Sequence, residues 1–87
     1  MSKQLRTPRH RRLMAVLAEV RTKAGVTQRE LARRLGRAHS YVSRIEKGDR
    51  RIDVPEMIQW CEVLNTDPVN VMKRIVRNRA DISGSSG

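Results

Sequence analysis

Hydrophobic residues recur at helical spacing along most of the chain. Apolar side chains three, four or seven positions apart lie on one face of an α-helix, and here Gly, Asp or Pro separates one such stretch from the next. The pattern predicts an all-α, compact five-helix domain. The expected helices span about residues 9–24, 27–36, 39–47, 53–64 and 68–79.

Start and stop signals support these limits. Thr27-Gln-Arg-Glu30 and Asp53-Val-Pro-Glu56 are both capping-box sequences. In each, we expect the first side chain to accept a hydrogen bond from the last amide and the Glu carboxylate to bond back. Gly25, Gly36 and Gly48 stand where a left-handed residue would end each of the first three helices.

The third helix is predicted to carry an unusual polar face. Ala38, Tyr41, Val42 and Ile45 form its expected core side. The other side is an arc of about 140° at 100° per residue, formed by His39, Ser40, Ser43, Arg44 and Lys47. Solvent-facing helices usually pair Glu with Lys or Arg, whereas this arc has donors and no acid. The helix start is weak, because the expected cap Ala38 has no side-chain oxygen.

The charge distribution favours a polyanionic partner. The 87 residues make one small domain, with 19 Lys and Arg against 9 Asp and Glu. Residues 1–51 carry 15 basic and 4 acidic groups, whereas residues 52–87 carry 4 and 5. Such an asymmetry is typical of nucleic-acid-binding chains. Charge alone leaves a generally basic surface as an open alternative.

Several classes of function lack their sequence signatures. The chain has no HExxH, paired CxxC, glycine-rich phosphate loop or nucleophile elbow, so we expect no enzyme activity, no cofactor and no metal site. The single Cys61 forms no internal disulfide and fits a reducing cytoplasm. No apolar run approaches the length of about 18 residues that a membrane span needs, and no small-molecule ligand is evident. Tyr41 and Trp60 are too few aromatics for RNA stacking platforms.

The segment from Gln28 to Lys47 resembles the helix-turn-helix of phage repressor and Cro proteins, the XRE-type family. The match rests on four positions at which the motif restricts side-chain size or shape: Ala32, Gly36, Val42 and Ile45. The resemblance covers about Arg12 to Leu64. It implies a lambda-repressor-like fold in which the third helix lies in the DNA major groove.

The same resemblance implies roles for particular residues. Residues expected to face DNA bases are His39, Ser40 and Arg44. Residues expected to contact DNA phosphates are Gln28, Ser43, Lys47, Arg50 and Arg51. Arg21 and Glu46 are expected to form a structural ion pair between the first and third helices.

Apolar residues cover more than one stripe of the last two expected helices. Two interpretations are open: all of them serve the domain's own core, or some form the interface of a symmetric homodimer. The candidate interface residues are Trp60, Met72, Ile75 and Val76.

Together these features predict a sequence-specific regulator of transcription that binds double-stranded DNA and acts as a repressor. We expect a flexible basic arm over residues 1–8, the DNA-binding domain over 9–79 and a disordered tail over 80–87. The arm either follows the DNA backbone or adds nonspecific attraction. The expected location is the prokaryotic or phage cytoplasm, at the nucleoid. The alternative is an antitoxin-like or other interaction adaptor that uses the helix-turn-helix as a scaffold and docks its partner on Trp60 and the fifth helix.

Overall fold

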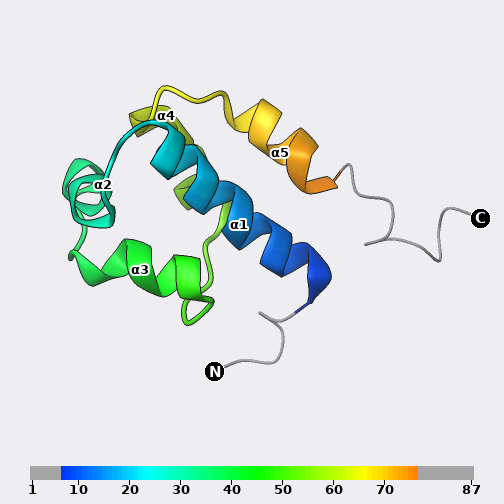
Figure 1. Cartoon of the computed structure of the whole chain (residues 1–87), viewed down its shortest axis with the longest axis horizontal. Helices are drawn as coiled ribbons and strands as arrows, with labels where there is room; N and C mark the ends of the chain where they lie inside the picture. Colours follow the sequence, from blue (N-terminus) through cyan, green and yellow to red (C-terminus); the bar gives the residue numbers. More distant parts are fainter. Residues whose placement is uncertain (1–6, 77–87) are drawn as a thin grey trace, which may run out of the picture.

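The computed structural model describes residues 7–76. Within this range the chain forms α-helices joined by short loops, with no strand, so the all-α prediction is confirmed (Figure 1). The five helices are α1 (Pro8–Lys23), α2 (Gln28–Leu35), α3 (Ser40–Lys47), α4 (Val54–Val63) and α5 (Pro68–Val76).

The observed limits differ from the predicted ones mainly at the two ends of the domain. The first helix begins at Pro8, because the Thr7 hydroxyl accepts a hydrogen bond from the His10 amide at 3.1 Å and proline suits the first helical position. Thr7 and Pro8 therefore belong to the folded domain rather than to the predicted arm. The rest of that arm, the predicted end of the fifth helix at residue 79 and the predicted tail lie outside the described residues.

Only one of the two predicted capping boxes forms completely. In α4, Asp53 and Glu56 each accept a hydrogen bond from the other's amide. In α2, the Thr27 hydroxyl accepts from the Glu30 amide, but the Glu30 carboxylate turns to arginines one turn further along the helix. At the start of α3, no side chain caps the helix and the cap position is His39. Ala38, predicted on the core side, is exposed because it lies before the helix.

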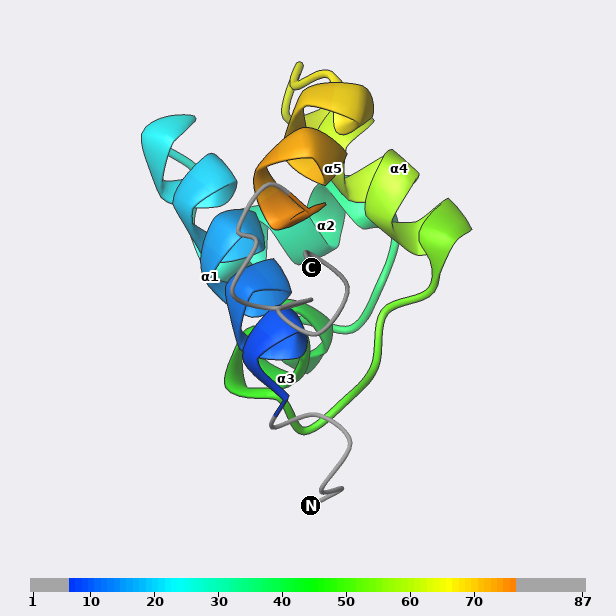
Figure 2. The same ribbon diagram turned by 90° about the vertical axis from the view of Figure 1, so that its right-hand side faces the viewer.

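Helix α1 lies in the middle of the molecule (Figure 1). It contacts α3 and α5, while α2 contacts α3 and α4. Figure 2 shows α3 and α5 far apart, with α1 extending between them. An ion pair of 2.6 Å between Glu19 and Arg74 ties α5 to α1. No helix within residues 7–76 combines the length and the apolar character needed to cross a membrane.

The core is built from every helix and includes two residues that had been predicted at a dimer interface. Trp60 is 0% exposed, and its indole nitrogen donates a hydrogen bond of 3.3 Å to the Leu17 carbonyl. Ile75 is only 5% exposed. Both side chains are covered by the domain itself, so they are unavailable to a second chain, and their inclusion in the predicted interface was wrong. Met72 and Val76 remain exposed.

Candidate nucleic-acid interface

Helices α2 and α3 pack against each other through small and apolar side chains. Ala32 and Val42 are 0% exposed and Ile45 is 1% exposed, so the backbones of the two helices approach closely. Gly36 ends α2 with a φ of 68°, in the left-handed region where a side chain would cause strain. The chain therefore leaves α2 in a tight turn and enters α3 four residues later.

The polar arc of α3 faces away from the core. His39, Ser40, Arg44 and Lys47 are exposed, and Ser43 is half-buried with its hydroxyl donating to the Ser40 carbonyl at 3.0 Å. None of the residues predicted to face bases is covered by the described part of the chain. One side of α3 therefore presents three kinds of hydrogen-bond donor: hydroxyl, imidazole and guanidinium groups.

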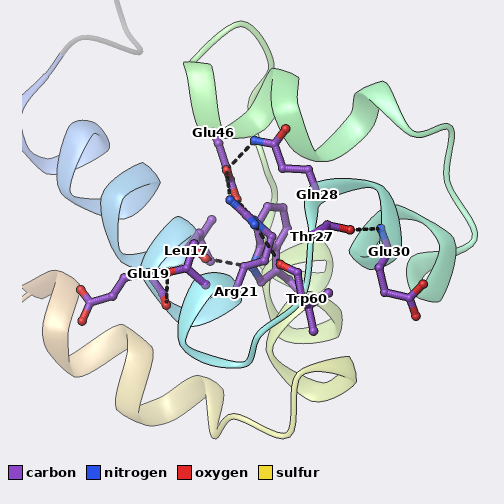
Figure 3. A network of polar contacts seen from close by, with 10 residues as sticks. Leu17, Glu19, Arg21, Thr27, Gln28, Glu30, Glu46 and Trp60 are labelled. Atoms are coloured by element: carbon purple, nitrogen blue, oxygen red, sulfur yellow. Dashed lines mark hydrogen bonds and ion pairs between the residues drawn. The ribbon is translucent and has the colours of Figure 1, made fainter.

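Arg21 and Glu46 hold α3 against α1 (Figure 3). The guanidinium donates two hydrogen bonds to the carboxylate, Nε to Oε2 at 2.7 Å and Nη2 to Oε1 at 3.0 Å. Its Nη1 also donates to the Val26 carbonyl at 2.9 Å. The side chains are only 13% and 8% exposed, and a bidentate pair in such surroundings fixes both position and angle.

Gln28 joins this network, which differs from its predicted role. Its side-chain amide donates to Oε1 of Glu46 at 2.8 Å (Figure 3). The side-chain amide is therefore engaged within the protein through one of its donors. The backbone amide of Gln28 still stands at the first position of α2, where helix amides attract anions.

A second carboxylate, Glu56, binds several residues beside the start of α3, in a cluster that the sequence analysis did not predict. Glu56 accepts hydrogen bonds from Arg37 at 2.9 Å and from Arg50 at 3.1 and 3.2 Å. Both guanidiniums lie over the Tyr41 ring, 4.5 and 4.8 Å from its centre. Arg50 also donates to the Arg51 carbonyl. Arg50, which was predicted to contact a DNA phosphate, is therefore also part of a cluster within the protein.

The cluster shifts the ionisation of its members. The hydrogen bonds from Arg50, and then that from the Asp53 amide, lower the pKa of Glu56 to about 2. The bond to Glu56 correspondingly raises the pKa of Arg50. Burial first, and the Glu56 charge second, raise the pKa of Tyr41. The Glu56 carboxylate and the Arg50 guanidinium are therefore both charged over the whole physiological range.

Neither a metal centre nor a reactive thiol is built into the described residues. Within residues 7–76, no three His, Cys, Asp or Glu side chains come together in a way that could hold a metal ion. Cys61 is fully buried, and this burial raises the pKa of its thiol to about 11. The thiol is therefore neutral and serves as a small apolar core residue.

Comparisons with known proteins agree with this geometry. The profile of the family Helix-turn-helix (HTH_3) matches residues 17–70. A solved structure described as an XRE-family-like protein from Pseudomonas syringae pv. tomato is 41% identical, with a TM-score of 0.76 over 84% of this chain and 89% of that one.

A second solved structure is that of the clp gene regulator ClgR from Corynebacterium glutamicum. It is 26% identical, with a TM-score of 0.71 over 87% of this chain and 82% of that one. A comparison with curated proteins gave no significant match. The chain belongs to the XRE-type helix-turn-helix family of DNA-binding transcription regulators.

Proposed function

We propose that this protein is a sequence-specific repressor that reads double-stranded DNA with α3 in the major groove. The observation that carries the proposal is the uncovered arc of donors on α3, which is anchored from behind by Val42, Ile45 and the Arg21–Glu46 pair. A rigid helix whose exposed arc bears donors and no carboxylate suits a groove lined by base acceptors and flanked by phosphates.

The base-facing residues are His39, Ser40 and Arg44. The Arg44 guanidinium can donate two parallel hydrogen bonds to O6 and N7 of a guanine, a pairing that discriminates by about 1–3 kcal/mol. Ser40 can donate to or accept from several bases. His39 is exposed at the cap position of α3, within reach of either a base or the adjoining backbone.

Phosphate contacts come from both sides of this arc. Lys47 and Arg51 are exposed and supply charge, Ser43 supplies a hydroxyl, and Gln28 contributes its backbone amide. Such contacts provide much of the affinity and none of the sequence information. The predicted basic arm stays part of the proposal, since the lowered pKa of His10, caused by burial and then by the Arg51 charge, indicates that α1 begins close to Arg51.

The test begins with selection of duplexes from a random library by the purified protein, followed by titration of the selected site with salt. We expect log K to fall steeply with log salt, as for displacement of roughly 6–10 counterions. Arg44→Ala should reduce the preference for the selected site, whereas Arg51→Ala should weaken all duplexes equally. Arg29→Ala, on the exposed surface of α2, is the matched control. Salt-insensitive binding, or equal affinity for all sequences, would contradict the proposal.

We further propose a homodimer formed through α4 and α5. Val54, Ile58, Val69 and Met72 are exposed by 36–58% and line one apolar groove of about 220 Å³ between the two helices. Val76, also exposed, lies one turn beyond Met72 on α5. A second copy is the occupant because residues 52–87 are nearly neutral, so two such faces approach without the repulsion that the other half would cause. The dimer would place two copies of α3 about 34 Å apart on a pseudo-palindromic operator.

Sedimentation tests this assembly. Met72→Asp should convert a dimer to a monomer, because it places a charge in the groove, whereas Gln59→Asp changes the charge equally at an exposed position of α4 outside the groove. A wild-type protein that stays monomeric, free and on its operator, would exclude the dimer. The adaptor hypothesis also uses this groove, since Trp60 is buried and cannot serve as its docking point. It gains support only if DNA binding requires an added protein.

The relatives support a regulatory role in a bacterial cell. One similar structure is described as a gene regulator from a bacterium, and the other as an XRE-family-like protein from a bacterium. We therefore place the site of action at the nucleoid.

A further inference from the structure

We propose that Glu56, which lies outside the helix-turn-helix, positions Arg37 and Arg50 as a preformed clamp for one DNA backbone phosphate. The inference rests on the proposed function. It joins Arg37 to the predicted phosphate contact Arg50 and adds a positioning residue, Glu56, that the sequence did not indicate. Arg37 precedes α3 and Arg50 follows it, so the two reach the clamp from opposite ends of that helix.

The first argument is the shape and lining of the clamp. A pocket of about 160 Å³ opens beside the first turn of α3. Since a water molecule takes up about 30 Å³ in the liquid, the pocket has room for a phosphate group. Its lining residues are Arg37, Ala38, Ser40, Tyr41, Arg44 and Arg50. Three arginines and two residues with hydroxyl groups, Ser40 and Tyr41, thus surround a space with no carboxylate among its lining residues.

The second argument is that the two clamp arginines are held before any ligand arrives. A long arginine side chain normally loses rotamer freedom when it binds, which reduces affinity. Here Glu56 and the Tyr41 ring restrict Arg37 and Arg50 from two directions. Each guanidinium has five N–H donors. The cluster engages one hydrogen bond from Arg37 and three from Arg50, so donors remain for a phosphate.

The third argument is the balance of charge. Glu56 and Asp53, whose charge also acts on Arg50, supply two negative charges, whereas Arg37, Arg50 and Arg44 supply three positive charges at the pocket. The surplus is therefore available to an anion. Ser40 and Arg44 also belong to the proposed base-facing arc, so the anion that meets this pocket during DNA binding is a backbone phosphate next to the first base pair read.

The decisive variant is Glu56→Gln, compared with Glu30→Gln. Glu30 also accepts hydrogen bonds from two arginines, Arg33 and Arg34, but from within its own helix. Both substitutions remove one negative charge, which by itself strengthens binding to DNA. Glutamine at position 56 can still complete the capping box, so α4 keeps its start.

We expect Glu56→Gln to weaken binding about tenfold, against the simple charge effect, because two arginines lose their fixed positions. Glu30→Gln should bind as tightly as the wild type or slightly more tightly. Because a phosphate carries no sequence information, the loss should be equal on the selected operator and on an unrelated duplex. Tighter binding by both variants would overturn the clamp. Absence of duplex binding by the wild type would instead overturn the proposed function.

A second measurement separates positioning from a general structural effect. Neutral methylphosphonates are placed one at a time along the operator. For the wild type, one position near the start of α3 should cost affinity, and Glu56→Gln should abolish the cost at that position alone. An unchanged methylphosphonate profile in Glu56→Gln would contradict the clamp.

Two further arms complete the design. If Glu56→Gln fails to fold, Arg37→Gln replaces it as the test variant. This substitution leaves the Glu56–Arg50 pair in place and should likewise abolish the methylphosphonate cost at the one position.

Inorganic phosphate should displace DNA no better than chloride at equal ionic strength. Specific competition by inorganic phosphate that disappears in Arg37→Gln would assign the pocket to a free anion and overturn the proposal.

Discussion

Two carboxylates, Glu46 and Glu56, fix the recognition helix and its flanking loops in different surroundings. Glu46 is 8% exposed, lies on α3 itself and bonds to Arg21 of α1 and Gln28 of α2. Glu56 is 14% exposed, lies on α4 and bonds to arginines whose side chains are 33–40% exposed. The first network is enclosed between three helices, whereas the second opens onto a pocket at the surface.

This difference in exposure suits the two networks to different tasks, stabilising the fold and binding a ligand. A charge enclosed between helices must keep all its partners, because losing one leaves the other uncompensated away from water. Arginines at the surface can be resolvated when their partner is lost, so they contribute little to stability. They can, however, be held ready for an anion. We therefore expect the Glu46 network to govern stability and the Glu56 cluster to govern affinity for DNA.

The largest expected effect is at Glu46. Replacing it with alanine removes the acceptor of Nε and Nη2 of Arg21 and of the Gln28 side-chain amide, and should lower the free energy of unfolding by about 3 kcal/mol. Urea denaturation followed by circular dichroism measures this loss, with Glu62→Ala on the exposed surface of α4 as the control. Equal stability of the two variants would show that the burial of the Glu46 network is energetically unimportant.

A smaller effect is expected at Glu56 and depends on pH. The folded chain lowers the pKa of this carboxyl from 4.5 to about 2, chiefly through the hydrogen bonds from Arg50. A carboxyl with a lower pKa in the folded state stabilises while ionised, so its contribution is complete above pH 4.5 and is lost as the pH falls toward 2. Denaturation midpoints of Glu56→Gln and the wild type should therefore converge across this range. A gap that stays constant would assign the stabilisation to groups other than the carboxyl charge.

The smallest effect is expected at Glu30. Its pKa is also lowered to about 2 by hydrogen bonds from Arg33 and then Arg34, but its side chain is 35% exposed, against 14% for Glu56. Many surface ion pairs contribute nothing measurable. Thermal unfolding of Glu30→Gln should match that of the wild type at neutral pH. A clear drop in the midpoint would mean that the number of arginine partners, and not burial, decides what such a carboxylate contributes.

What the sequence could predict was decided by local rules and by family resemblance. The helices followed from spacing and cap residues, the arc of α3 from its angular distribution of donors, and the Arg21–Glu46 pair from the helix-turn-helix motif. Contacts between distant segments could not be read in this way. Arg37 and Glu56 are 19 positions apart, and only the packing of α2 on α4 brings them together.

The errors have related physical causes. An apolar pattern shows that a side chain prefers to be buried, but not which neighbour covers it. Trp60 therefore seemed available to a partner, although the Leu17 carbonyl on α1 accepts its indole hydrogen bond. Glu30 matched a capping box, but arginines three and four positions later competed for the carboxylate. In both cases the side chain makes a contact that the sequence pattern does not encode.

The position of Trp60 has a practical consequence. It is the only tryptophan of the chain and lies fully inside the core, where its indole nitrogen donates to the Leu17 carbonyl of α1 (Figure 3). Its intrinsic fluorescence should therefore report global unfolding, with a red-shifted emission when water reaches the indole, while staying nearly constant as duplex is added. Stability and DNA affinity can thus be followed in the same cuvette without an attached dye.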